Sequence, residues 1–281
     1  MVRLTDINYH YKKAQPLFRQ LSLALEPGNV YGLLGKNGAG KTSLLKIMAG
    51  LLFPKSGQVR VGAYRPGDRH PDFLSDLYLI PEELFLPEIA IGAYRDLYAP
   101  FYRRFDNARF EKYLASFGLN NSLKINQLSQ GQKKKAITAF GLSTNARLLL
   151  LDEPTNGLDI PSKSLFRKTI AGAISDEQIC VISTHQVRDM GSLMDPIIIL
   201  DQGKIIFQEN LQRIAERLQF EVTYSRGEPE GVYYTERVPG GYMVVRRNDD
   251  GEETEVDIEV FFNAMMSNPS DLQGLFAEAD Y

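Results

Sequence analysis

Gly35-Lys36-Asn37-Gly38-Ala39-Gly40-Lys41-Thr42 is the stretch that decides the fold of this 281-residue chain. The apolar run Asn29–Leu34 before it indicates a buried strand, and residues 43–49 after it have helical spacing and end at Gly50. A G-x-x-x-x-G-K-[ST] pattern between a strand and a helix predicts a phosphate-binding loop. Its glycines let backbone N–H groups wrap phosphate oxygens, and the positive N-terminal end of the helix strengthens the attraction.

Two side chains of this loop have individual roles in the prediction. Lys41 reaches the β- and γ-phosphates of a nucleotide, and the Thr42 hydroxyl is a ligand of Mg²⁺. The alternative is a glycine turn that joins the strand to the helix and binds nothing, but the flanking strand and helix argue against it. The residues expected to contact the nucleotide are Gly35, Lys36, Asn37, Gly38, Ala39, Gly40, Lys41, Thr42 and Ser43.

The composition is typical of a soluble globular protein, with 43% hydrophobic and 24% charged residues. A formal net charge of −3 gives no reason to expect nucleic acid as a partner. The single cysteine, Cys180, lies in an apolar stretch (residues 178–183), so we expect a buried core residue. No N-terminal signal peptide is expected, and no segment approaches the ~18 apolar residues of a membrane span.

The pattern along the chain predicts an α/β fold. Short strands are expected at residues 3–9, 21–25 and 58–64, and a buried strand at 74–80. From about residue 88 to 145 the spacing is helical, with a helix that Asp106 caps and Gly118 ends. Continuous apolar strands then alternate with helices, which is typical of a parallel sheet buried on both faces. These strands are expected at residues 148–152, 179–183 and 196–201.

After about residue 210 the composition changes. We expect a helix over residues 211–220, a hairpin turn at 248–251 and a final helix over 257–266. The complete prediction is a P-loop NTPase core with an N-terminal antiparallel β-subdomain, an inserted helical subdomain (about 88–145) and a small α+β C-terminal extension. Residues 1–210 form the ATPase domain, and residues 211–281 form the extension, for which the sequence indicates no role.

Two further motifs carry chemistry. Asp152 and Glu153 end the buried strand Leu148–Asp152, where the aspartate can hold Mg²⁺ and the glutamate can polarise an attacking water. Ser129 and Gln132 form an S-x-x-Q capping box at the start of a helix with one apolar face. This second motif is either a capped helix alone or a second phosphate site, and a second phosphate site requires two copies of the chain to face each other.

With these motifs, the chain resembles the nucleotide-binding subunits of ABC transporters over roughly residues 1–210. The residues of that resemblance are Gly35 to Thr42 (Walker A), Leu128 to Gln132 (the signature, with Gln130 in place of a glycine), Leu148 to Glu153 (Walker B), Asn156 to Asp159 (the D-loop) and His185 (the switch histidine). Five motifs in the family's order are far more specific than any one of them.

The resemblance implies a role for each matching residue. Tyr11 stacks on adenine, Glu153 is the general base, and His185 binds the γ-phosphate and orients the water. Ser129 and Gly131 contact the γ-phosphate bound to another protomer, which requires a head-to-tail dimer in which Asp159 positions the opposite site. Lys133, Lys134 and Lys135 are expected on the solvated face of the signature helix.

One position departs from the family. The family has a glutamine that ligates Mg²⁺ where the buried strand before the helical subdomain ends, and here Glu82 aligns best with it. The resemblance therefore implies metal ligands at Thr42, Asp152 and Glu82, with ATP and Mg²⁺ bound.

The function that follows is an ATP-hydrolysing motor, a homodimer on the cytoplasmic face of the cell membrane that drives a separate transmembrane permease subunit. The form of the D-loop region (residues 155–159) and the lack of a large importer domain favour an exporter. The alternative is a soluble ABC ATPase acting on nucleic acid or ribosomes. A small-molecule kinase or GTPase is disfavoured by the signature and by the absence of an Asn-Lys-x-Asp motif.

Overall fold

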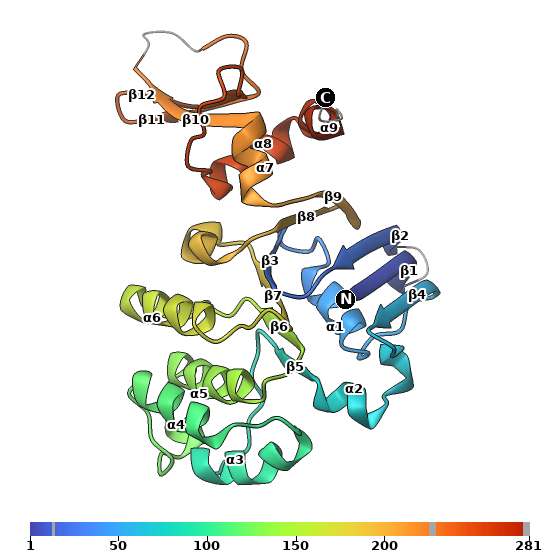
Figure 1. Ribbon diagram of the computed structural model, residues 1–281, viewed down its shortest axis with the longest axis vertical. Coiled ribbons are helices and arrows are strands. Elements are labelled where there is room, and N and C mark those ends of the chain that lie inside the picture. Colours follow the sequence, from blue (N-terminus) through green and yellow to red (C-terminus); the bar gives the residue numbers. More distant parts are fainter. Residues whose placement is uncertain (13–14, 225–228, 278–281) are drawn as a thin grey trace.

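A six-stranded sheet stands at the centre of the molecule (Figure 1). The computed structural model describes residues 1–12, 15–224 and 229–277. The strand order is β5-β6-β7-β3-β8-β9, in which the first five strands are parallel and β9 runs antiparallel to β8. The strands are β3 (Asn29–Leu34), β5 (Leu77–Ile80), β6 (Leu148–Asp152), β7 (Ile179–Thr184), β8 (Ile197–Asp201) and β9 (Lys204–Glu209).

Both faces of this sheet are covered, as the continuous apolar runs predict. Every residue of β6 and β7 is buried. Leu148 and Leu150 belong to the core shared with helix α1 (Lys41–Met48), and Leu149 and Leu151 to the core shared with the helical region. Burial of each such leucine contributes about 1.5–3 kcal/mol. Cys180 is fully buried, which confirms the prediction, and burial raises the pKa of its thiol.

The N-terminal strands form a separate antiparallel sheet beside α1, in the order β2-β1-β4. The strands β1 (Val2–Lys12), β2 (Gln15–Leu25) and β4 (Ser56–Val61) confirm the predicted β-rich region, but β1 and β2 are longer than expected. Register shifts between β1 and β2 interrupt the alternation of buried and exposed residues. The apolar pattern of the sequence therefore predicts only part of each strand. β4 ends at Val61, because Val61 and Tyr64 bond to each other across a tight turn.

The helical region confirms the predicted change of period. It contains α3 (Ile91–Tyr98), α4 (Asn107–Ser116) and α5 (Gln130–Ser143). Asp106 caps α4 by accepting a hydrogen bond from the Arg109 N–H at 3.0 Å. The strand predicted over residues 74–80 is shorter, because helix α2 (Pro71–Ser75) occupies its first residues. Proline at the first position of α2 favours that helix start.

The remaining helices lie in loops and along the sheet. They are α6 (Ile160–Ala171) and the 3₁₀ turns η1 (Pro66–Asp68), η2 (Ala99–Phe101), η3 (Ile125–Gln127), η4 (Val187–Asp189) and η5 (Gly191–Leu193).

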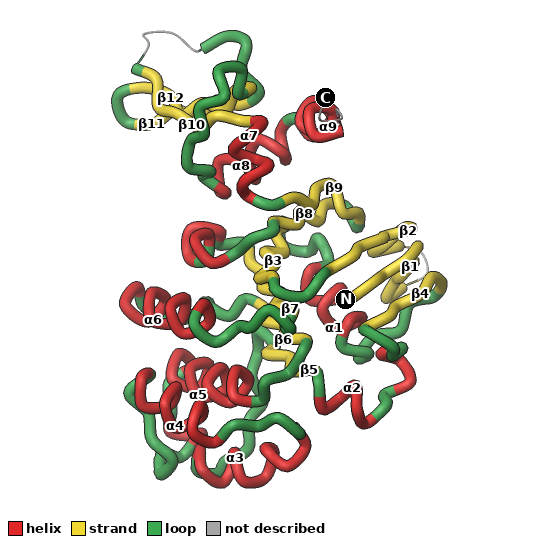
Figure 2. The backbone as a smooth tube through the Cα atoms, in the orientation of Figure 1, coloured by secondary structure: helices red, strands yellow, loops and turns green. Residues whose placement is uncertain are grey.

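The C-terminal residues form a small α+β unit at the end of the molecule opposite α3–α5 (Figures 1 and 2). Its sheet has the order β10-β12-β11. The elements are α7 (Leu211–Arg217), β10 (Leu218–Thr223), β11 (Tyr234–Val238), β12 (Gly241–Arg247), α8 (Ile258–Ser267) and α9 (Pro269–Ala277).

Two predictions in this unit are wrong in detail. The helix expected over residues 211–220 ends at Arg217, because Leu218 and the residues after it pair with β12. Residues 248–251 bend the chain, with Gly251 at φ +75° and its N–H bonded to Asn248 Oδ1, but this bend follows β12 and does not join the two strands of a hairpin. The hairpin turn lies at Gly240, between β11 and β12. The helix predicted over residues 257–266 is confirmed as α8, which Asp257 caps, but it is not the final helix, because α9 follows it. In the described residues no helix has the length and apolarity to cross a membrane.

Candidate nucleotide-binding and catalytic site

The glycine-rich loop and the predicted residues Glu82, Glu153 and His185 gather at one edge of the central sheet. In a parallel sheet all the carboxyl ends of the strands meet at the same edge. The neighbouring strands β5, β6, β7 and β3 therefore deliver Glu82, Glu153, His185 and the glycine-rich loop to one place. A cavity of about 600 Å³ lies there, and its lining residues are Tyr11, Leu17, Asn37, Gly38, Gly40, Lys41, Thr42, Ser43, Glu82, Glu153 and His185.

The glycine-rich loop has the shape of an anion cradle. Gly40 has φ +111°, and a Cβ at this position would lie 2.7 Å from the ring of Phe18, so only glycine fits. Within the described residues no side chain caps the start of α1. The first N–H groups of a helix lack partners inside the helix, so here they are available to phosphate oxygens.

Lys41 lies in the first turn of α1 with its ammonium buried. Its Nζ donates to the Gly35 carbonyl oxygen at 2.8 Å and lies 3.6 Å from Glu153 Oε1. These contacts hold the side chain across the loop, where it lines the cavity. A buried ammonium group at the N-terminus of a helix without a side-chain cap is suited to bind a polyphosphate.

Glu153 and His185 form a hydrogen-bonded pair. Glu153 Oε1 lies 2.8 Å from His185 Nδ1, and the His185 backbone N–H donates to Oε2 at 3.4 Å. The Glu153 carboxylate is almost completely buried, so these contacts and Lys41 replace its hydration. Glu153 also has the left-handed φ of +46°, which is uncommon for a residue with a Cβ. Such backbone strain is typical of functional sites.

Thr42 and Asp152 fit the ligand set that Mg²⁺ needs in a nucleotide complex. Asp152 is buried, and its Oδ1 accepts a hydrogen bond from Ser183 Oγ at 2.5 Å, so one carboxylate oxygen is oriented. Mg²⁺ is usually bound by one or two protein oxygens together with substrate phosphates and water. Among the described residues no group of three His, Cys, Asp or Glu is placed to hold a metal ion.

Comparison with known proteins identifies the family. The model of the ABC transporter family matches residues 18–156. The SkfA peptide export ATP-binding protein SkfE of Bacillus subtilis is 31% identical over 192 residues, which are 66% of this chain and 80% of SkfE. The chain belongs to the ABC transporter ATP-binding proteins. It is an ATPase that serves as the motor subunit of an ABC transporter.

Further relatives and solved structures agree with this membership. The ABC transporter ATP-binding protein NatA of Bacillus subtilis is 28% identical over 226 residues, 77% of this chain and 92% of NatA. A solved ATP binding subunit of an ABC transporter superposes with a TM-score of 0.67 at 24% identity, over 76% of this chain and 91% of that one. This likeness confirms the predicted P-loop NTPase core of the ABC ATPase.

Tyr11 lies on the rim of the cavity, at the end of β1. Its hydroxyl is 2.9 Å from Ser43 Oγ, and its ring packs edge-on against Tyr9 at 5.1 Å between centroids. The side chain is 64% exposed. An exposed ring held at a phosphate site has a free face, as stacking on adenine requires, so the role of Tyr11 stays a prediction.

The signature residues do not line the cavity of their own chain. Ser129 forms the predicted capping box at the start of α5, with bonds to Gln132 at 3.2 and 2.9 Å. Gly131 lies against the D-loop, where an added Cβ would be 3.2 Å from the Gly157 carbonyl oxygen. Asp159 caps α6 by accepting from the Ser162 N–H at 2.9 Å, and hydrogen bonds from the Ser162 hydroxyl and N–H lower the pKa of its carboxyl group. Ser129, Gly131 and Asp159 do not line the described cavity, so a contact of these residues with a nucleotide stays a prediction.

Glu82 lines the cavity and is hydrogen-bonded at its edge. Its Oε1 accepts from Asn156 Nδ2 at 3.1 Å. The structure thus brings Glu82 to the candidate site, and its contact with Mg²⁺ stays a prediction.

The sequence reasoning misplaced Lys134. Lys133 and Lys135 are partly exposed as expected, but Lys134 is 5% exposed, and its Nζ donates to the Glu153 carbonyl oxygen at 2.9 Å. The helical spacing does indicate this burial. Lys134 lies three residues before the buried Ile137, and residues three apart share one face of a helix. The Ser183 contact with Asp152 was also missed.

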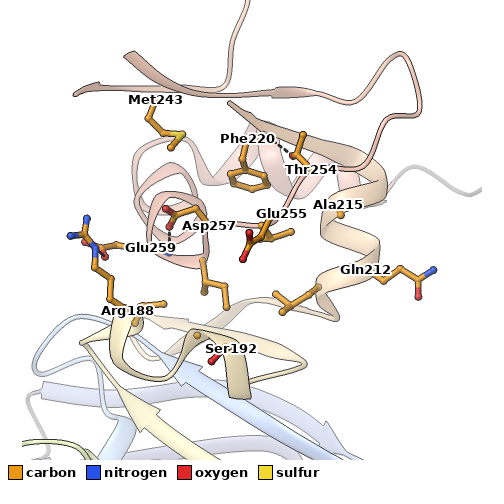
Figure 3. A pocket seen from close by; sticks show the side chains of 15 residues that line it. Arg188, Ser192, Gln212, Ala215, Phe220, Met243, Thr254, Glu255, Asp257 and Glu259 are labelled. Atoms are coloured by element: carbon orange, nitrogen blue, oxygen red, sulfur yellow. Dashed lines mark hydrogen bonds and ion pairs between the residues drawn. The ribbon is translucent and has the colours of Figure 1, made fainter. Parts of the chain in front are cut away.

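A second cavity, of about 670 Å³, lies between the C-terminal extension and the segment after His185 (Figure 3). Arg188 and Ser192 approach it from that segment, and Phe220, Glu255 and Asp257 from the extension. Arg188 forms an ion pair with Glu259 of α8. None of the residues predicted to bind nucleotide lines this cavity, and the structure describes all of them. The smaller cavity at the sheet edge is therefore the candidate catalytic site.

Proposed function

We propose that two copies of this ABC ATPase close head to tail over two Mg-ATP molecules and that hydrolysis reopens them. The observation that supports this proposal is the place of Ser129. It stands at the N-terminal end of α5, a position suited to phosphate, yet it lies outside the cavity that contains Lys41. A second copy turned to face the first brings its Ser129 and Gly131 to that cavity, with Asp159 beside the opposite site.

Within each site the residues divide the chemistry of ATP hydrolysis. The loop backbone and Lys41 bind the phosphates of the substrate, and Tyr11 stacks on its adenine. Glu153 takes a proton from the attacking water, and the bond at His185 Nδ1 leaves Nε2 as the ring atom for the γ-phosphate. Thr42 and Asp152, with Glu82 nearby, would hold Mg²⁺, which would supply positive charge to the phosphates.

The partner of this motor is proposed to be a separate transmembrane permease subunit. Large apolar side chains are exposed on the helical side, where Phe85 is 91%, Leu97 56% and Phe101 67% exposed. The proposal takes these side chains as parts of one contact surface, since contiguous exposed apolar patches mark interaction sites. Phe85 lies three residues after Glu82, so one short segment joins this surface to the nucleotide cavity. The net charge of −3 supports a protein partner rather than nucleic acid.

We further propose that the motor works on the cytoplasmic face of the cell membrane and in export. Among the relatives, SkfE is named for peptide export at 31% identity. The phosphonates import ATP-binding protein PhnC of Wolinella succinogenes is 27% identical, over 79% of this chain and 88% of PhnC. The relatives thus include an exporter and an importer, and the proposal of export rests on the form of the D-loop region, residues 155–159.

Substitution of Ser129 tests the head-to-tail site. Ser129→Arg is expected to leave the ATP affinity of the isolated chain within about threefold of wild type while turnover falls by about 100-fold, since the added side chain blocks the composite site and not the chain's own cavity. Ala115→Arg, at an exposed position of α4 in the same helical region, is the matched control and should keep its turnover. Full turnover by Ser129→Arg would contradict the proposal.

Substitution of Glu82 tests its contact with the metal. A glutamine keeps one neutral oxygen for Mg²⁺, whereas alanine keeps none. We expect ATPase activity of Glu82→Ala to need more Mg²⁺ than wild type, by about three- to tenfold, and Glu82→Gln to shift less. The measurement is an ATPase titration of the three proteins against Mg²⁺. Three identical curves would remove Glu82 from the metal site.

A further inference from the structure

Lys134 has an unusual position for a lysine in a run of three. Its side chain is 5% exposed, and its Nζ donates to the main-chain carbonyl oxygen of Glu153, 2.9 Å away. Lysine is almost never fully buried unless it is paired. The contact joins the first turns of α5, the helix that begins with the signature, to the residue proposed as general base.

The carbonyl group that Lys134 holds belongs to a strained residue. Glu153 has φ +46°, and its carbonyl oxygen also accepts from the Asn156 N–H at 3.3 Å. Strained backbone persists only where its surroundings fix it. The orientation of the peptide group after Glu153 therefore depends on Lys134, and the same backbone turn directs the Glu153 side chain toward Lys41 and His185.

The same network extends to Glu82. Asn156 donates from its backbone to Glu153 and from its side chain to Glu82 Oε1, at 3.1 Å. Burial lowers the pKa of Lys134, and the charges of Glu82, Glu153 and Asp152 act in the opposite direction. Two ammonium groups contact Glu153: Lys41 Nζ lies 3.6 Å from its carboxylate, and Lys134 Nζ lies 2.9 Å from its carbonyl oxygen. Removal of Lys134 would take away the ammonium group on the side of α5.

We propose that Lys134 is a positioning residue that fixes the Glu153 backbone and also supplies the countercharge for Glu82. The inference rests on the proposed role of Glu153 as general base. It accounts for a second carboxylate in this cavity: the negative charge of Glu82 near Glu153 is tolerated because a buried cation lies in the same network.

The experiment is a double-mutant cycle on the full-length chain. The variants are Lys134→Met, Lys134→Arg, Glu82→Gln and the pair Lys134→Met with Glu82→Gln, each assayed for kcat and KM with Mg-ATP. Lys133→Met is the matched control, because Lys133 is partly exposed on the same turn of α5. Thermal unfolding of every variant is measured in parallel.

We expect Lys134→Met to lower kcat about tenfold or more while KM changes less than about threefold. Lys134→Arg should regain most of kcat, because it keeps a cation with donors. Glu82→Gln should restore part of the loss when it is added to Lys134→Met, and the control should resemble wild type. Non-additivity of this kind is the mark of two groups that interact.

Two results would overturn the inference. A wild-type kcat in folded Lys134→Met removes the positioning role, and an equal effect of Lys134→Met in the wild-type and Glu82→Gln backgrounds removes the countercharge role. If Lys134→Met does not fold, Lys134→Gln replaces it and keeps a donor without charge. Undiminished turnover by Glu153→Gln would instead refute the base assignment alone. In that case the melting temperatures of the same four proteins in the double-mutant cycle would still show whether Lys134 and Glu82 are coupled.

Discussion

Glu153→Gln is expected to lower ATP turnover by about 100-fold to 10,000-fold, the usual contribution of a general base. The amide has nearly the same volume and can keep the 2.8 Å contact with His185, so the site should retain its shape. It cannot accept a proton from water, so the chemical step stops. ATP affinity should stay within about threefold of wild type, because Lys41 and the loop backbone are unchanged.

The same variant should accumulate as an ATP-bound dimer. Closure would precede hydrolysis, so a protein that binds but does not hydrolyse remains closed. Size-exclusion chromatography with and without ATP measures this, and turnover is measured on the same sample. Glu177→Gln, at an exposed position just before β7, is the charge-matched control and should behave as wild type. A variant that stays monomeric in saturating ATP and still turns over would contradict both the base assignment and the closed dimer.

The central sheet could be predicted from the sequence because its signals are local. A strand buried on both faces is a continuous apolar run, and Leu148–Asp152 is one. Parallel strands also place their carboxyl ends together, so motifs far apart in the chain could be assigned to one edge of the sheet before any contact was known. Lys41, Glu153 and His185 meet there at distances of 3.6 and 2.8 Å.

The contacts that the sequence did not reveal depend on tertiary structure. Lys134 was assigned to solvent because charged residues usually lie there, and only the packing of α5 against the residue after β6 provides the Glu153 carbonyl as its partner. In the extension, Leu218 continues the apolar spacing of α7, but pairing with Arg247 makes it a strand. In both cases the partner lies about 20–30 residues away along the chain, and for Leu218 the pairing overrides local helical spacing.

Lys41→Ala is expected to weaken ATP binding by about 100-fold or more. A lysine that bonds two phosphate groups contributes about 1.5–3 kcal/mol for each charge-assisted hydrogen bond, and alanine supplies none. The substitution also removes the bond to the Gly35 carbonyl oxygen and the charge 3.6 Å from Glu153. A buried carboxylate then loses one of its partners, so the melting temperature without nucleotide should fall by a few degrees, about 1 kcal/mol of stability.

Two measurements separate the loss of binding from the loss of stability. Direct titration with Mg-ATP gives the affinity, and thermal unfolding with and without ATP shows whether ligand still stabilises the fold, since a ligand that binds only the folded state raises its stability. Lys46→Ala lies on the same helix and removes the same charge outside the cavity, so it should keep the wild-type gain in melting temperature. Lys41→Met, which keeps the apolar stem, should lose that gain as Lys41→Ala does. Lys41 is the ammonium group that lines the described cavity. Wild-type affinity for Mg-ATP in both Lys41 variants would therefore mean that the loop is only a turn between β3 and α1.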